Sequence, residues 1–149
     1  MKSTEPRLAR SVGAIAVALL LAALVWKLTR DERAYVPGGL AGVRLGSTLQ
    51  EARAALPGLE GPDGRARTRV FDEPATCTLE LGAASKVSSI ECVLDDARAR
   101  AKVLATLREL YGEETETRED TWSWRNRQAL LVLSTSPALA LRLAVPTGP

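Results

Sequence analysis

The sequence predicts an α+β fold, in which an N-terminal transmembrane helix precedes a small domain with two helices packed on one antiparallel sheet. Three observations predict this fold. An uninterrupted apolar run occupies residues 12–26. Further along, segments with apolar residues at helical spacing alternate with segments in which apolar and polar residues alternate, as in half-buried strands. The two halves also resemble each other, with Leu110 aligning 54 residues after Leu56, which suggests two copies of an α-β-β unit.

Residues 11–28 form the predicted membrane anchor. Their 18 residues, at about 1.5 Å of rise each, cover roughly 27 Å of a hydrocarbon layer about 30 Å thick. Trp26 and Lys27 suit the headgroup region at one end. A cleaved secretory signal is the alternative, but residues 26–33 offer no pair of small residues two apart for cleavage. We therefore expect an uncleaved single-pass helix.

Basic groups around the anchor set its expected orientation. Counting the α-amino group, four precede the anchor and three follow it, which favours a cytoplasmic N-terminus over residues 1–10. A linker is expected over 29–42, a domain over 43–145 and a tail over 146–149. The domain is then expected in the periplasm, held at the cytoplasmic (inner) membrane of a bacterium.

The charge of the chain is divided between these parts. Up to residue 33, six Lys and Arg residues stand against three acids, whereas the later residues carry 14 against 15. The basic balance of the whole chain therefore belongs to the flanks of the anchor. A near-neutral domain without a stripe of basic residues lacks the positively charged surface that nucleic-acid binding requires.

The domain begins with a short strand, expected at 43–45, and a helix. Ser47 can cap this helix, with Gln50 three residues on in the capping-box position. Pro57 and Gly58 end the helix, and a loop follows.

Alternation and helical spacing predict the remaining elements. Asp95 and Asp96 can cap a second helix over 97–111, and the acidic stretch 113–120 is expected to be solvated surface. Half-buried strands are expected at the following positions: 76–81, 88–94, 121–125, 129–135 and 139–145.

The two cysteines lie on the strands of one predicted hairpin. If Gly82 lies opposite Val87, antiparallel partner numbers sum to 169, so Cys77 faces Cys92 on the buried side. Opposite Cβ atoms are about 4.5–5.5 Å apart, wider than the ~3.8 Å of a disulfide, so a bridge needs a local adjustment. In an oxidising compartment we expect the disulfide; the alternative is a pair of small buried thiols. Without C-x-x-C spacing, a catalytic dithiol is not expected.

Residues 46–58, Gly-Ser-Thr-Leu-Gln-Glu-Ala-Arg-Ala-Ala-Leu-Pro-Gly, carry a family resemblance. This stretch resembles the opening of the SmpA/OmlA small outer-membrane lipoprotein modules, where a glycine, a capping hydroxyl and a helix ending in Leu-Gly precede a β-hairpin. The tandem arrangement is similar to that of the β-lactamase inhibitor protein, with two such repeats side by side. The first cysteine here is Cys77, so no acylated N-terminal cysteine is present and a transmembrane helix would replace the lipid. The resemblance implies a non-catalytic module that binds other envelope proteins.

The inventory of reactive groups agrees with a non-enzymatic protein. The chain has no histidine, the commonest general base and metal ligand. Glu119 and Asp120 would point to opposite faces of a strand, and Asp95 and Asp96 are expected to be caps, so neither pair forms an acid–base dyad. We find no phosphate-binding glycine motif, nucleophile elbow or zinc spacing. We expect no catalytic residues, no cofactor and no metal.

Two groups of side chains are candidates for an interface. Trp122 and Trp124 project from one face of a strand; core packing is the first interpretation, and an interface anchor is the second. Arg65, Arg67 and Arg69 share a face if the chain is extended there. A solvated edge that discourages strand pairing is the first interpretation for them, and an anion or lipid-headgroup site is the second.

These observations favour a membrane-anchored periplasmic protein-interaction module, either an accessory of an envelope complex or an inhibitor of an envelope enzyme. Its partners would be the membrane, through residues 11–28, and another envelope protein. The alternative is a small-molecule or lipid-binding domain that uses a concave sheet face around the tryptophans. An apolar cavity would favour that alternative, and a filled interface between sheet and helices would count against it.

Overall fold

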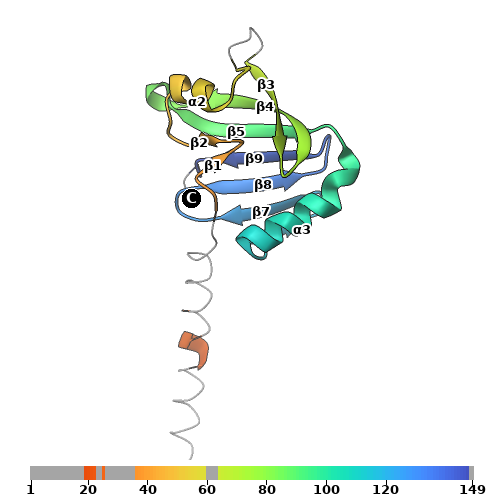
Figure 1. The fold of residues 1–149 in the computed structure, drawn as a ribbon. Coiled ribbons are helices and arrows are strands. Elements are labelled where there is room, and N and C mark those ends of the chain that lie inside the picture. The colour runs from red at the N-terminus through yellow and green to blue at the C-terminus, as the bar shows by residue number, and fades with distance from the viewer. Residues whose placement is uncertain (1–18, 23–24, 26–35, 60–63, 148–149) are drawn as a thin grey trace, which may run out of the picture. The chain divides into compact units, whose positions relative to one another are not determined.

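A computed structural model gives the structure of the chain (Figure 1). The residues that it describes are 19–22, 25, 36–59 and 64–147. Residues 34–149 form one of two compact units, here called the domain.

The predicted transmembrane helix needs a correction. Of the expected anchor over 11–28, residues 19–22 and 25 are described and are helical. The rest of it, the N-terminus at 1–10 and the first part of the linker lie outside the described residues. Within the part of the chain that the structure describes, no helix is long and apolar enough to cross a membrane.

The domain is built on a seven-stranded antiparallel sheet. Strands β3, β4 and β5 form one meander, and β6, β7, β8 and β9 form a second. The C-terminal strand β9 pairs with β5 and so joins the two meanders. In order across the sheet, the strands are β3 (Arg65–Val70), β4 (Glu73–Leu81), β5 (Val87–Leu94), β9 (Ala140–Ala144), β8 (Leu130–Ser134), β7 (Thr121–Arg125) and β6 (Glu116–Arg118).

Few helical residues accompany this sheet. The described helices of the domain are α2 (Leu49–Ala55) and α3 (Arg100–Tyr111), with 3-10 turns η1 (Ala83–Ser85) and η2 (Ala97–Ala99). A small ribbon of β1 (Gly39–Leu40) and β2 (Val43–Arg44) precedes α2. The fold is therefore strand-rich, and the prediction of two α-β-β repeats is wrong, because the two halves contribute three and four strands to the sheet.

The two strands of this sheet that the prediction lacked are its edge strands, β3 and β6. In β3 the outward positions are arginines and the inward ones are Ala66, Thr68 and Val70, so apolar alternation is weak. β6 has the sequence Glu-Thr-Arg and no buried residue. An edge strand has a neighbour on only one side, so little apolar surface is needed to hold it.

Helix α2 begins one residue later than expected. Its N-cap is Thr48, whose side chain accepts a hydrogen bond from the Glu51 amide while Glu51 accepts one from the Thr48 amide at 2.8 Å. Ser47, the predicted cap, instead donates to the Arg44 carbonyl at 2.7 Å. Ala52 and Leu56 are buried, as helical spacing requires.

Helix α3 continues from η2. Asp96 caps η2 by accepting from the Arg98 amide at 2.9 Å. Val103 and Leu107 on α3 are completely buried, and Gly112 ends the helix with a φ of 81°. Glycine adopts a positive φ without the steric cost of a Cβ and is common at the end of a helix.

The β4–β5 hairpin has the predicted register with a corrected loop. Leu81, rather than Gly82, lies opposite Val87, and a bulge between Glu80 and Leu81 restores the partner sum of 169 further along. Cys77 therefore lies opposite Cys92, and the two form the expected disulfide. Their Cα atoms are 4.0 Å apart, closer than the ~4.5 Å usual for such a pair, which is the local adjustment that the bridge needs.

The core lies between one face of the sheet and the helices α2 and α3 (Figure 1). The disulfide belongs to it, as do the inward residues of β8 and β9. Val36 and Leu40, from the segment expected to be a linker, are also buried in this core.

Candidate interaction surface

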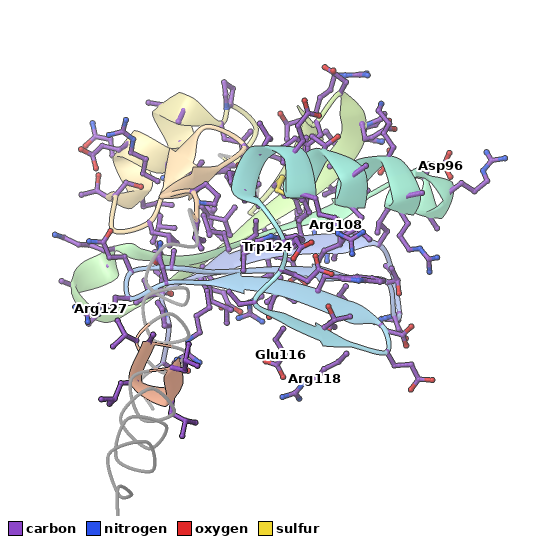
Figure 2. All side chains as sticks on the ribbon, turned by 90° about the horizontal axis from the view of Figure 1, so that it is seen from below. Asp96, Arg108, Glu116, Arg118, Trp124 and Arg127 are labelled. Atoms are coloured by element: carbon purple, nitrogen blue, oxygen red, sulfur yellow. A yellow bond between two sulfur atoms is a disulfide. The ribbon has the colours of Figure 1, made fainter. Side chains whose placement is uncertain are left out.

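The second face of the sheet, here called the outer face, points away from the core. Side chains that are directly opposed across antiparallel strands share a face. One such row crosses the whole sheet on the outer face: Arg65, Thr78, Glu91, Arg142, Val132, Ser123 and Glu116. Figure 2 shows Glu116 and Arg118 projecting from the side of the sheet opposite α3. In the described part of the domain, α2 and α3 both lie on the core side.

The middle of the outer face carries small and aliphatic side chains. Val93 on β5 is 37% exposed, and the outward residues of β8 and β9 are half-buried except for Arg142. These half-buried residues are Leu130, Val132, Ser134, Ala140 and Ala144. Short side chains on a pleated sheet leave a surface that a second protein can approach closely.

Two charged side chains near the middle of this face, Arg142 and Glu80, form an ion pair. Arg142 donates to Glu80 at 2.8 Å across β5, and the Ser89 hydroxyl donates to the same carboxylate at 2.6 Å. The Ser89 hydrogen bond, with the nearby Arg142 charge, lowers the pKa of Glu80. This carboxylate is therefore ionised near neutral pH, so it carries no proton with which to act as a general acid.

Arg65, Arg67 and Arg69 lie on the outer side of β3, at one end of the sheet, and are exposed. The expectation that they share a face is correct. Arg67 forms an ion pair with Asp95 at 2.5 Å, yet its side chain keeps 76% of its exposure. Arg69 donates to the carbonyl of Asp72 in the β3–β4 turn. We call these three residues and their backbone the arginine edge.

The tryptophans point into the opposite, core face. Trp124 is completely buried, and its Nε1 donates to the Gly112 carbonyl at 2.9 Å. Trp122 is partly buried, with the Arg100 guanidinium 5.8 Å from its ring centre. Figure 2 shows Trp124 between the sheet and α3. The structure thus separates the tryptophans from the arginine edge, and core packing is the role that their burial supports.

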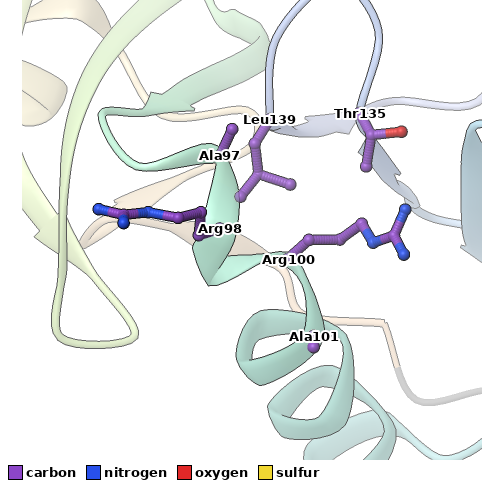
Figure 3. Close-up of a pocket in the computed structure, with 6 residues that line it drawn as sticks. All are labelled: Ala97, Arg98, Arg100, Ala101, Thr135 and Leu139. Carbon is purple, nitrogen blue, oxygen red and sulfur yellow. The ribbon is translucent and has the colours of Figure 1, made fainter.

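An open depression of about 540 Å³ lies where η2 meets the loop between β8 and β9. Its lining residues are Ala97, Arg98, Arg100, Ala101, Thr135 and Leu139. In Figure 3, Arg100 extends toward Thr135, whereas Arg98 points away from it. Arg98 is paired with Asp96 at 3.2 Å, and Arg100 stacks on Trp122. Both cations are thus engaged within the domain.

A second open depression, of about 400 Å³, lies between β2 and the start of α2. The only carboxylate in its lining is that of Glu51, which completes the capping box. Hydrogen bonding to the Thr48 backbone lowers the pKa of Glu51. This group therefore stabilises the helix end and is not poised for proton transfer near neutral pH.

The described residues contain no group of three or more His, Cys, Asp or Glu side chains that could hold a metal ion. Every buried polar side-chain atom among them also has a hydrogen-bond partner. The site that the geometry offers is thus a surface, made of the outer face and the arginine edge.

Three members of this surface were not predicted from the sequence: Glu80, Ser89 and Arg142. Strand alternation places each of them on a polar side, which is a usable signal. Their meeting also requires β9 to pair with β5, across a separation of 62 residues between Glu80 and Arg142. Nothing in the local pattern of the sequence specifies that pairing.

No protein-family profile matches the chain, and no curated protein matches it. Among solved structures, the chain is similar to a DUF4309 family protein, YjgB, from Bacillus subtilis. The identity is 12%, the TM-score is 0.45, and the alignment covers 80% of this chain and 93% of that protein. The similarity of residues 46–58 to the SmpA/OmlA modules stays a prediction from the sequence.

Proposed function

We propose that this protein is a non-catalytic interaction module of the bacterial cell envelope. Its domain lies in the periplasm at the inner membrane and binds another envelope protein. The observation that carries the proposal is the outer face of the sheet, which all seven strands form, which holds the Glu80–Arg142 ion pair and which is free of the described helices. The disulfide agrees with an oxidising compartment.

The size of the outer face bears on how a partner would use it. Seven strands about 4.8 Å apart and roughly 17 Å long give a planar area of about 500 Å². Each partner in a stable complex usually buries about 800 Å². We therefore expect the partner to extend beyond the outer face onto an adjoining surface.

A small-molecule or lipid-binding domain is the competing proposal. It needs an apolar hollow on the tryptophan face. Helix α3 fills that face, with Val103, Leu107 and Trp124 all completely buried. A filled interface leaves little room for a ligand of drug or lipid size, which occupies roughly 300–1,000 Å³. The burial of these residues supports the interaction module instead.

The test is photo-crosslinking of the full-length chain in its own envelope. A photoreactive amino acid replaces Thr78, Ser123 or Val132 on the outer face, or Ala105 or Leu110 on the exposed side of α3 as a matched control. We expect one defined protein adduct from the outer-face positions and none from α3. A chain that ends at residue 33 controls for contacts made by the N-terminal segment. Adducts only from α3, no specific adduct, or catalytic turnover by the purified protein would each refute the proposal.

A further inference from the structure

The arginine edge has an open backbone as well as charged side chains. β3 is the end strand of the sheet and, among the described residues, pairs only with β4. The turn between them consists of Phe71 and Asp72, both with positive φ (51° and 64°), and Val70 lies opposite Glu73. This is the geometry of a two-residue hairpin.

The register of this hairpin decides which backbone groups face outward. The pair that closes a two-residue hairpin exchanges both of its hydrogen bonds, and such pairs alternate along an antiparallel ladder. Ala66, Thr68 and Val70 are therefore bonded to β4. The N–H and C=O groups of Arg65, Arg67 and Arg69 point away from β4, toward the free edge.

Pro74 supports this assignment independently. It lies opposite Arg69, and its carbonyl accepts a hydrogen bond from the Asp95 amide at 3.0 Å, on the β5 side. Proline has no N–H to give to a neighbouring strand. The pair of Arg69 and Pro74 is thus a position without hydrogen bonds between β3 and β4, as the alternation requires.

The same residues of the arginine edge supply both free backbone groups and charged side chains. The same three residues that point their backbone groups outward carry their guanidinium groups on the outer face, roughly 6.8 Å apart along the strand. That spacing matches alternate residues of an added strand. Two copies of β3 pairing with each other would place arginines beside arginines, which is unfavourable. Carboxylates at alternate positions of an incoming strand would instead lie beside the arginines.

We propose that the partner adds an extended acidic segment to β3 as a further strand of the sheet, in the manner of β-augmentation. The backbone groups of Arg65, Arg67 and Arg69 bind the segment, and their side chains select carboxylates at every second position. This inference rests on the proposed function and specifies its partner. It also supplies the adjoining surface that the small outer face requires.

The test uses the full-length chain in detergent micelles and a synthetic nine-residue peptide that alternates glutamate with valine. Two peptides serve as controls: one alternates lysine with valine, and one has the same composition as the first with all glutamates placed before the valines. Fluorescence anisotropy measures binding. We expect only the alternating acidic peptide to bind, and hydrogen exchange to slow at the amides of Arg65, Arg67 and Arg69 but not at Thr117 on the other edge strand.

Two substitutions separate the backbone from the side chain. Arg67→Ala removes one guanidinium, leaves its partner Asp95 unpaired and keeps the outward N–H, so binding weakens by about threefold. Arg67→Pro removes the N–H as well, without touching the β3–β4 ladder, so binding weakens by about 30-fold. Circular dichroism melting checks that both variants are folded.

A third variant leaves the backbone unchanged. Arg65→Glu together with Arg69→Glu should reverse the preference, so that the lysine peptide binds and the acidic one does not. Arg44→Glu with Arg53→Glu, at exposed positions on β2 and α2, is the matched control and should keep the original preference.

Several results would overturn the inference. One such result is equal binding of the peptide whose glutamates all precede its valines. Others are equal affinities of the Arg67→Ala and Arg67→Pro variants, or no slowing of hydrogen exchange on β3. Each would mean that the arginine edge attracts acidic peptides only by non-specific charge. If the peptide-binding and hydrogen-exchange predictions fail while photo-crosslinking still captures a protein on the outer face, strand addition is wrong and the proposed function stands.

Discussion

Glu114 links the end of α3 to the edge strand β6. Replacing Glu114 with glutamine should make the free energy of unfolding of the domain vary less with pH in the acidic range. Its carboxylate accepts two hydrogen bonds from Arg108, at 2.9 Å from Nε and 2.6 Å from Nη2, and a third from the Thr117 hydroxyl at 3.1 Å. The side chain of Glu114 is only 12% exposed. These contacts, that of Arg108 above all, lower the pKa of Glu114 from 4.5 to about 2.

The magnitude follows from the two pKa values. A carboxyl that titrates at 4.5 in the unfolded chain and at about 2 in the folded chain stabilises the fold by at most about 3 kcal/mol. The side chain of Arg108 is 47% exposed, so water and salt screen the pair. We expect Glu114→Gln to lower the free energy of unfolding by about 1–2 kcal/mol at pH 7.

The dependence on pH has a definite sign. The folded pKa lies below the unfolded one, so the contribution is complete well above pH 4.5 and is lost as the pH falls toward about 2. Urea unfolding of the wild-type and Glu114→Gln proteins from pH 7 to pH 2.5 measures it. The two curves should converge on the acidic side. Glu116→Gln, which removes an exposed partner of Arg118, is the control and should change stability by less than about 0.5 kcal/mol. A difference between wild type and Glu114→Gln that stays constant over this range would refute the reasoning.

Three further changes test the packing of the domain. Replacing both Cys77 and Cys92 with alanine opens a loop of 15 residues and should lower the free energy of unfolding by about 3 kcal/mol, measured by denaturant titration; no change relative to wild type would mean that the bridge is absent in solution. Thr48→Ala removes the capping box and should cost about 1 kcal/mol in thermal unfolding. Gly39→Ala would place a Cβ 2.5 Å from the Val43 carbonyl oxygen and should destabilise the domain by about 1–3 kcal/mol, whereas Gly38→Ala meets nothing within 4 Å and should be neutral; equal melting temperatures for the two variants would contradict the close approach of β1 and β2.

The β4–β5 register was predictable because alternation fixes parity. Cys77, Leu79 and the inward residues of β5 form one apolar row, and slipping the pairing by one residue would turn that whole row toward solvent. The predicted pairing was wrong only at the loop, where Leu81 and not Gly82 lies opposite Val87. The bulge absorbs the difference, because burying the apolar row is worth more than a regular turn.

The position of the first helix cap was not predictable from local sequence. Both Ser47 with Gln50 and Thr48 with Glu51 satisfy the spacing of a capping box. The choice is tertiary: the Ser47 carbonyl accepts from the Val87 amide at 2.8 Å, which ties Ser47 to β5. Thr48 is then the first residue free to cap α2.

The candidate surface shows the same limit. Alternation placed Arg65, Arg67 and Arg69 on one side of an extended segment, and it placed Trp122 and Trp124 together. Which of the two sides the helices cover depends on where α3 packs after a crossover, and no short-range pattern encodes that. The pairing of β5 with β9, which brings Arg142 to Glu80, is likewise a long-range event.

The division between the two faces of the sheet also limits how this domain can bind. Its large apolar side chains, Trp124 above all, are buried in the core. The outer face therefore offers short side chains, paired charges and a free strand edge. Binding there depends on backbone hydrogen bonds and on charge rather than on a buried aromatic hot spot. Charges at an exposed edge are screened over about 8 Å at physiological salt, so the affinity for an acidic strand must fall as salt rises, whereas the backbone contribution persists. A partner held in this way exchanges readily. Under the proposed function both proteins are kept at the same membrane, and the higher effective concentration there would offset the fast exchange.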